Sequence, residues 1–338
     1  MSRFTLIFIW SLLLTLAACS DSRWDVDTSA VDSDLTFHRL DRDIFSEDYQ
    51  SQKEKMNTIA EKYGNFAQIY TADIMQAGPV DNPMTAELLN RFSSDPNWRE
   101  LQNQIDKTFP NLGAEEDALE SAFKRYAVFF KADTLPQLVA YNSGFNIGIF
   151  PTPNWLGVGL EWYAGSDYPL IERLPPDLFP QYKRDKFKPE YLVPNALKGW
   201  LLVRFQGDMG EENLLGRMVF SGKILFITSV LMEENSTARL LNYSSEEYQW
   251  CRDQSYSIWN HLVESDLLFS SDVMEINKWM NDGPFTPGMP PESPGGVGNW
   301  IGFEMVQAYM EANDDVGLDE LISNNNNREF LKYYKPVK

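Results

Sequence analysis

The sequence predicts an α+β fold that is mostly helical and contains one small antiparallel sheet. Apolar residues recur at helical spacing in two long stretches, before residue 134 and after residue 190. Between them, residues 135–165 hold short apolar segments separated by Asn, Gly and Pro, a pattern typical of strands and tight turns. With 43 % hydrophobic residues in 338, the chain can bury a large core. We expect one globular domain over residues 36–338, with a helical part (36–134), the sheet (135–165) and a second helical part (190–338).

The first residues have the features of a secretory signal. Arg3 precedes an apolar run from Phe4 to Leu16, which is too short to span a membrane as a helix. The run ends in Leu16-Ala-Ala-Cys19, the pattern of a bacterial lipobox. We therefore expect residues 1–18 to be a lipoprotein signal peptide and Cys19 to carry lipid, since two or three acyl chains anchor a protein stably. The alternative is an ordinary signal peptide with a chance cysteine.

Residues 19–35 are expected to form an acidic, flexible tether, because spaced Asp residues stand among Ser and Thr. Ser20 follows the cysteine where an Asp would favour the inner membrane, so we expect the outer membrane, with the periplasmic face favoured over the cell surface. The formal net charge of −20 argues against nucleic acid as a partner and against an electrostatic grip on anionic lipid. Membrane lipid attached through Cys19 is the expected contact.

Each element has its own local signal. The chain is expected to be helical from Phe37 to about Lys131. Three strands are expected at 138–141, 147–150 and 156–163, the last alternating apolar residues with glycines that indicate a close backbone or ligand approach.

The chain after residue 190 is expected to be helical. Helices are predicted at 194–205, at 211–232, from a Ser244–Glu247 capping box to Leu262, and from Pro294-Gly-Gly through Tyr309. The apolar helix over 211–232 contains Arg217 and Lys223, which favour a buried core helix over a membrane span.

The familiar catalytic patterns are missing from the sequence. The two histidines, His38 and His261, lack partners at metal-ligand spacing, and no phosphate loop, nucleophile elbow or dinucleotide fingerprint occurs. Cys251 is expected to be a small buried residue. We therefore expect no catalytic residue, no metal and no cofactor. The side chains expected to line a cleft or an interaction surface are Glu161, Trp162, Trp200, Ser221, Trp300 and Glu304.

Several motifs carry a resemblance to a known family. The stretch Glu292-Ser-Pro-Gly-Gly-Val-Gly-Asn-Trp-Ile-Gly through Met310 closely resembles the end of GldB, the gliding-motility lipoproteins of Bacteroidota. Phe37-His-Arg-Leu-Asp41, Leu160-Glu-Trp-Tyr-Ala-Gly165, Phe220-Ser-Gly-Lys223 and Glu247-Tyr-Gln-Trp-Cys251 agree with it in the family's order. The resemblance implies a role in gliding motility and in the linked type IX secretion machinery at the outer membrane, with other proteins of that system as partners. It implies no established enzymatic activity.

A second, weaker resemblance concerns the fold. The order of sheet, helix, long helix and Gly-x-Trp-x-Gly looks like a family of zincin-type metallopeptidases. Those proteins carry His-Glu-x-x-His where this chain has Asn195–Arg204, and Glu-Gly where it has Ser221-Gly222. The resemblance implies a degenerate zincin-like helical arrangement that cannot hold zinc. Gly298 and Gly302 are spaced to let the last long helix pack closely on a neighbour, with chance glycines as the alternative.

The leading hypothesis is a non-enzymatic, membrane-anchored lipoprotein that scaffolds or stabilises a motility and secretion assembly. One alternative is a zincin-like peptidase with a non-standard site. The other is a lipoprotein that binds a small ligand in a deep pocket near Glu161 and Trp162.

Overall fold

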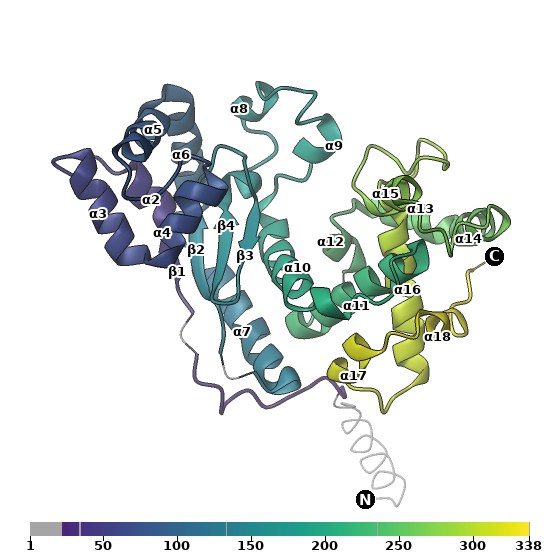
Figure 1. The fold of residues 1–338 in the computed structure, drawn as a ribbon. Helices are drawn as coiled ribbons and strands as arrows, with labels where there is room; N and C mark the ends of the chain where they lie inside the picture. Colours follow the sequence, from purple (N-terminus) through teal and green to yellow (C-terminus); the bar gives the residue numbers. More distant parts are fainter. Residues whose placement is uncertain (1–21, 34, 133, 235, 338) are drawn as a thin grey trace, which may run out of the picture.

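A small mixed sheet lies between two groups of helices (Figure 1). The computed structural model describes residues 22–33, 35–132, 134–234 and 236–337. The four strands follow the order β1-β2-β4-β3. Their bounds are β1 (Phe37–Arg39), β2 (Gln137–Tyr141), β3 (Ile149–Pro151) and β4 (Trp155–Gly159). The mostly helical α+β class is confirmed.

The predicted antiparallel arrangement of this sheet is wrong in part. Strand β2 pairs in parallel with both β1 and β4, and only the β3–β4 pair is antiparallel. The reason is the path of the chain after β2, which reverses before β3 and places β3 on the far side of β4. Strands β2 and β3, which are consecutive in the sequence, are therefore not neighbours, whereas the short turn between β3 and β4 makes a hairpin.

The prediction of helix from Phe37 onward also needs correction, because Phe37–Arg39 is the edge strand β1. Its partner is β2, with Phe37 opposite Leu138 and Arg39 opposite Ala140. The pairing joins segments about 100 residues apart, so local periodicity could not indicate it.

Helices cover both faces of the sheet. Val139 and Tyr141 face a smaller core formed with the first helices, whereas Leu138, Ala140, Leu156 and Val158 face the main core. The helices of the first part are α2 (Leu40–Phe45), α3 (Gln52–Tyr63), α4 (Asn65–Ile69), a π-helical turn (Tyr70–Ile74), α5 (Pro83–Ser94), α6 (Pro96–Thr108) and α7 (Gly113–Phe130).

The glycines of β4 are explained by packing within the chain. A Cβ on Gly157 would come within 2.7 Å of the Phe66 ring and 2.9 Å of the Tyr141 ring. The close approach predicted from the sequence is therefore made by aromatic side chains of the smaller core. The strand also ends at Gly159, and Leu160–Tyr163 is a 3₁₀ turn rather than a continuation of the strand.

The second helical part begins after a connection with little regular structure. This connection contains α8 (Pro169–Glu172), α9 (Gln181–Arg184) and a 3₁₀ turn (Pro189–Tyr191). The elements that follow are α10 (Leu192–Arg204), a 3₁₀ turn (Gln206–Asp208), α11 (Leu214–Met232), α12 (Thr237–Leu241), α13 (Ser245–Asp253), α14 (Ser255–Glu264), α15 (Val273–Met280), α16 (Val297–Ala312), α17 (Leu318–Ser323) and α18 (Asn327–Leu331).

The capping box is confirmed, since the Ser244 hydroxyl accepts from the Glu247 N–H and the Glu247 carboxylate accepts from the Ser244 N–H. The helix that it opens ends earlier than predicted, because the chain breaks at Gln254 into α13 and α14. The start of α16 after Pro294-Gly-Gly is also confirmed.

Helix α11 is the centre of the second part. It is apolar and 19 residues long, and 78 % of its most apolar stretch is buried by the rest of the chain, as expected of a core helix. It packs on α16 at two glycines. A Cβ on Gly302 would lie 1.8 Å from the Met218 carbonyl oxygen, and one on Gly222 would lie 2.1 Å from the Gly302 carbonyl oxygen. The predicted close packing of α16 is thus confirmed at Gly302, while Gly298 packs against Trp279 and Met280 of α15.

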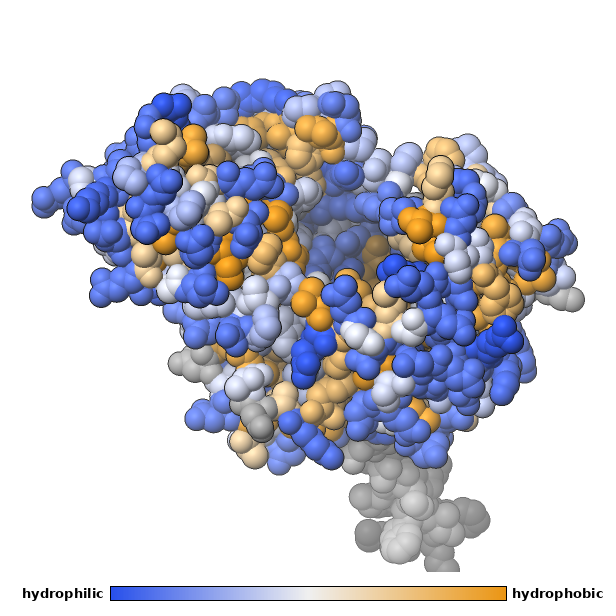
Figure 2. Space-filling model, viewed as in Figure 1, coloured by the Kyte–Doolittle hydropathy of each residue, from blue (hydrophilic) through white to orange (hydrophobic). Residues whose placement is uncertain are grey.

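The two groups of helices leave a hollow between them. In Figure 2 the surface is hollowed between the part that carries α5, α6, α8 and α9 and the part that carries α13 to α15. Helices α10 and α11 lie beneath this hollow (Figure 1).

Candidate functional site

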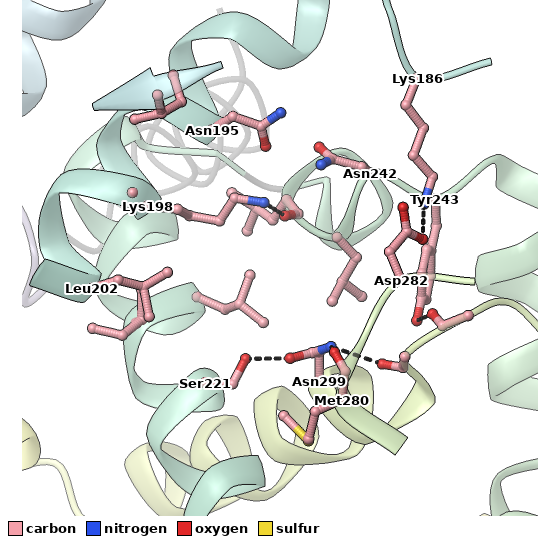
Figure 3. Close-up of a pocket in the computed structure, with 18 of the residues that line it drawn as sticks. Lys186, Asn195, Lys198, Leu202, Ser221, Asn242, Tyr243, Met280, Asp282 and Asn299 are labelled. Atoms are coloured by element: carbon pink, nitrogen blue, oxygen red, sulfur yellow. Dashed lines mark hydrogen bonds and ion pairs between the residues drawn. The ribbon is translucent and has the colours of Figure 1, made fainter. Parts of the chain in front are cut away.

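A cavity of about 420 Å³ lies at the base of this hollow, and we call it the α10–α11 cavity. Figure 3 shows side chains that converge on it from several elements. Its polar lining consists of Tyr163, Lys186, Asn195, Lys198, Ser221, Asn242, Tyr243, Asp282 and Asn299.

Helix α10 contributes one wall. Asn195, Lys198 and Leu202 follow one another at spacings of three and four residues, so they share the face of α10 that lines the cavity. Gly199 lets this helix lie against the sheet, since a Cβ there would come within 2.7 Å of Ile149 in β3.

Lys198 has an unusual environment for a lysine. Its ammonium donates a hydrogen bond to the Leu240 carbonyl, and no salt bridge to it is found in the described part of the chain. Burial, and secondarily the positive charge of Lys186, lower its pKa from 10.5 to about 7. The pKa of Lys198 therefore lies close to neutral pH.

The opposite wall comes from the packed helices α11 and α16. The Ser221 hydroxyl donates to Asn299 Oδ1 at 2.6 Å, and Asn299 Nδ2 donates to the carbonyls of Met280 (2.8 Å) and Gly296 (3.0 Å). The Tyr243 hydroxyl donates to the Gly295 carbonyl at 2.8 Å. These bonds fix the Gly-Gly turn at the start of α16 as a rigid part of the lining.

The rim of the cavity carries one ion pair. Lys186 Nζ lies 2.5 Å from Asp282 Oδ1, and the pair joins the connection after α9 to the loop after α15 (Figure 3). The two charges neutralise each other.

The edge strand β3 borders the cavity, because Ile149 is part of the lining. Gly148 accepts a hydrogen bond from Gly159, and Thr152 donates one to Trp155. The alternation of an antiparallel ladder therefore turns the N–H and C=O of Ile149 away from β4. A strand edge and a polar cavity thus lie side by side.

The lining does not fit a zinc ion. In a His-Glu-x-x-His helix the two histidines are four residues apart on one face. The cavity-lining pairs at that spacing on α10 are Lys198 with Leu202 and Asn195 with Gly199, which has no side chain, and Ser221 lies opposite on α11. Leucine has no donor atom, and a lysine ammonium repels a cation. Among the described residues, no group of three His, Cys, Asp or Glu side chains is placed to hold a metal ion.

Of the residues that the sequence indicated for a cleft, Ser221 lines the cavity and the others lie elsewhere. Glu161 is fully buried behind β3 and β4. Its Oε1 accepts from the Ser143 N–H (2.8 Å), the Ser143 hydroxyl (2.7 Å) and the Phe145 N–H (3.2 Å), which fixes the turn after β2. Burial raises its pKa from 4.5 to about 7 despite these bonds.

The three tryptophans predicted for the cleft lie outside the α10–α11 cavity, and Trp200 lines a second cavity between α7 and α10. Trp162 stands in an aromatic cluster with Phe145, Phe179 and Phe187. Trp200 packs edge-on against Tyr126 of α7. Trp300 is 1 % exposed in the main core.

Glu304 is half-buried on another face of α16. Burial raises its pKa, which the charge of Arg252 partly offsets. Cys251 is fully buried, and burial raises the pKa of its thiol, which keeps it protonated. His38 and His261 lie on β1 and α14, in different parts of the fold.

Two residues before β1, Arg23 and Trp24, contact the helices of the main core. The Arg23 guanidinium donates to the carbonyls of Met310 (2.7 Å) and Asn313 (3.1 Å) at the end of α16. The Trp24 ring packs edge-on against Phe129 and Phe226, of α7 and α11. We call Arg23 and Trp24 the N-terminal clamp. Cys19 and the signal peptide lie outside the described residues.

Sequence reasoning missed Lys198, Asn242, Asp282 and Asn299. The sequence does contain an indication of Lys198, because it is the one cation before Arg204 in a mostly apolar helix. The others come from separate turns and helices, and only the tertiary structure brings them together.

Comparison with known proteins gives one family. No curated protein and no solved structure matches the chain significantly. A family model described as "Gliding motility protein GldB" matches residues 21–336. This range covers the sheet, both groups of helices and the α10–α11 cavity, and the chain therefore belongs to the GldB family of gliding motility proteins.

Proposed function

We propose that this chain is a lipid-anchored, non-enzymatic component of the gliding motility and type IX secretion machinery at the outer membrane, where it holds a segment of another protein. The observation that carries the proposal is the strand edge of β3 beside the polar α10–α11 cavity. An extended segment gains main-chain hydrogen bonds on such an edge, and a neighbouring pocket selects its side chains.

The polar groups of the cavity are suited to binding. Asn195 and Asn242 present amides, which both donate and accept hydrogen bonds as a peptide backbone requires. The Asn242 Oδ1 atom is buried and has no hydrogen-bond partner within the described residues. A ligand amide would satisfy it.

The N-terminal clamp supports a fixed orientation on the membrane. Four residues separate Cys19 from Arg23, and such a segment spans at most about 14 Å. A lipid on Cys19 would therefore hold the clamp, at the C-terminal end of α16, close to the bilayer. Asn299 in the cavity is eleven residues away from Met310 in α16, or about 16 Å along the axis. The cavity would thus face away from the lipid, toward a partner in the periplasm.

The anchor is tested with Cys19→Ala in a gliding host. We expect the variant chain to leave the membrane fraction and cells to stop spreading on agar. Ser20→Ala is the control and should remain in the membrane. A Cys19→Ala chain that stays in the outer membrane, with normal spreading, would contradict the anchoring.

A hydrolase remains the second candidate on one observation, the presence of Ser221 and Lys198 in the same cavity. A serine nucleophile requires a base within hydrogen-bond reach. Here the Ser221 hydroxyl donates to Asn299 and Lys198 donates to Leu240, and no bond joins the two within the part of the chain that the structure describes. Labelling by a fluorophosphonate that Ser221→Ala abolishes would establish the hydrolase. Stoichiometric zinc by mass spectrometry would establish the metallopeptidase alternative.

The small-ligand alternative gains no support at Glu161 and Trp162. The Glu161 Oε1 atom is held by the turn after β2, and the Trp162 ring is packed among phenylalanines.

A further inference from the structure

The charges that line the α10–α11 cavity differ from those of the rest of the chain. The protein has 49 acidic and 29 basic residues. The charged residues of the cavity lining are Lys186, Lys198 and Asp282, so the balance there is positive. Asp282 is paired with Lys186 at the rim. The charge left over is that of Lys198.

The ammonium of Lys198 has donors to spare. It can donate three hydrogen bonds, and the structure shows one, to the Leu240 carbonyl. In Figure 3 its side chain extends from α10 into the space between Asn195, Asn242 and Ser221. A ligand atom in this space would meet the ammonium, neutral amides and a hydroxyl.

The strand edge and the lysine are placed to act on one ligand. Ile149 and Gly199 are in contact, and Lys198 is the neighbour of Gly199 on α10. A segment paired with β3 at Ile149 would therefore pass beside Lys198.

We propose that the cavity binds a carboxylate of the partner segment on Lys198 Nζ, either the C-terminal carboxylate or an acidic side chain, while the neighbouring residues of the segment pair with β3. This assignment rests on the proposed function and specifies its recognition chemistry. The lowered pKa of Lys198 agrees with it. Burial makes the unpaired charge unfavourable, and a bound carboxylate would restore it.

Four other titratable groups face Lys198 from the elements around the cavity. Lys186 and Asp282 form the rim pair, and Tyr163 and Tyr243 are buried. Burial raises the pKa of both tyrosines, so they stay neutral. Lys198 is thus the group in the lining whose charge changes near neutral pH.

The experiment is NMR of the full chain in detergent, with lysines labelled at ¹³Cε and Lys198 assigned through Lys198→Arg. Three probes are used: N-acetyl-trialanine with a free carboxylate, the same peptide as its amide, and N-acetyl-Ala-Glu-Ala amide. We expect a carboxylate-bearing probe to bind about tenfold or more tightly than the trialanine amide, as a hydrogen bond between charged groups implies. The Lys198 resonance should then titrate at a higher pH with that probe than without it.

The two carboxylate probes distinguish the sources. Tighter binding of the free trialanine assigns a C-terminal carboxylate, and tighter binding of the glutamate peptide assigns an acidic side chain. Lys198→Met should reduce both to the affinity of the amide, whereas Lys53→Met, on the exposed start of α3, should change neither.

Failure of this inference can be told from failure of the proposed function. If all three probes bind equally and Ile149 amide signals shift, the segment binds without a carboxylate, which overturns the inference alone. If no probe shifts Ile149 or Lys198 at millimolar concentration, both the inference and the strand-edge binding are overturned.

Discussion

Two lysines on adjacent helices, Lys223 buried and Lys198 half-buried, differ in what surrounds them. Lys223 of α11 is 1 % exposed and donates to the carbonyls of Ile322 (3.3 Å) and Asn324 (2.6 Å) at the end of α17. Its ammonium also lies 5.5 Å from the centre of the Phe330 ring. Lys198 of α10 makes one hydrogen bond to a carbonyl and otherwise faces a cavity.

The difference separates a structural lysine from a binding one. The donors of Lys223 satisfy carbonyls that a helix end leaves without partners, so its burial holds α17 and α18 on α11. Lys198 donates a hydrogen bond to one carbonyl of the surrounding fold, that of Leu240. Burial lowers the pKa of both, to about 8 for Lys223 and about 7 for Lys198. Lys198 joins α10 to the end of α12 by a single hydrogen bond, and the rest of its ammonium faces the cavity, which points to a ligand.

The largest expected change in stability concerns the contact between α11, which carries Lys223, and α16, which lines the cavity that Lys198 faces. Gly302→Ala should lower the free energy of unfolding by about 3 kcal/mol, because a Cβ there overlaps the Met218 carbonyl and the helices must separate. Chemical denaturation measures it. Gly207→Ala is the matched control, since its Cβ would meet nothing within 4 Å. Equal stability of the two variants would show that the close helix contact is wrong.

The next effect concerns Lys223. Lys223→Met should destabilise the chain by roughly 2 kcal/mol, since the carbonyls of Ile322 and Asn324 lose their donor. Hydrogen exchange should rise first in α17. An unchanged free energy of unfolding would remove the structural role assigned to this lysine.

The smallest effect has the opposite sign and concerns Lys198. Lys198→Met should stabilise the chain by about 1 kcal/mol at pH 7, because it removes a charge that burial disfavours and loses only one hydrogen bond, to the Leu240 carbonyl. The unfolded chain binds a proton at Lys198 up to pH 10.5, and the folded chain releases it near pH 7. Stability of the native sequence should therefore rise between pH 7 and 10.5.

The rise in stability with pH should be smaller in Lys198→Met. The rise that remains in this variant comes from Lys223, which loses its proton near pH 8 in the folded chain and near pH 10.5 in the unfolded chain. Denaturation midpoints across this range measure both. A loss of stability in Lys198→Met at pH 7 would show that Lys198, like Lys223, has a structural role.

Local signals in the sequence predicted much of the helical part. The Ser244–Glu247 capping box, the start of α16 and the burial of α11 each depend on a few consecutive residues. The parallel pairing of β1 could not be predicted, since Phe37 and Leu138 are far apart in the sequence.

The candidate site was less accessible to sequence reasoning. Ser221 was indicated, but Glu161 was chosen for its glycine neighbours, and Gly157 in fact makes room for Phe66. Lys198 carried a signal as a cation in an apolar helix. Its partners in the cavity come from turns at 242 and 282 and from α16 at 299, which no periodicity connects.

The central claim, that this motility protein acts through Lys198 in the cavity, is tested most directly in cells. The measurement is the spreading rate on agar of cells whose sole copy carries Lys198→Met, against cells carrying Lys53→Met, with equal amounts of both proteins in the membrane fraction. We predict that Lys198→Met cells fail to spread while Lys53→Met cells spread normally. Normal spreading of Lys198→Met cells would contradict the account.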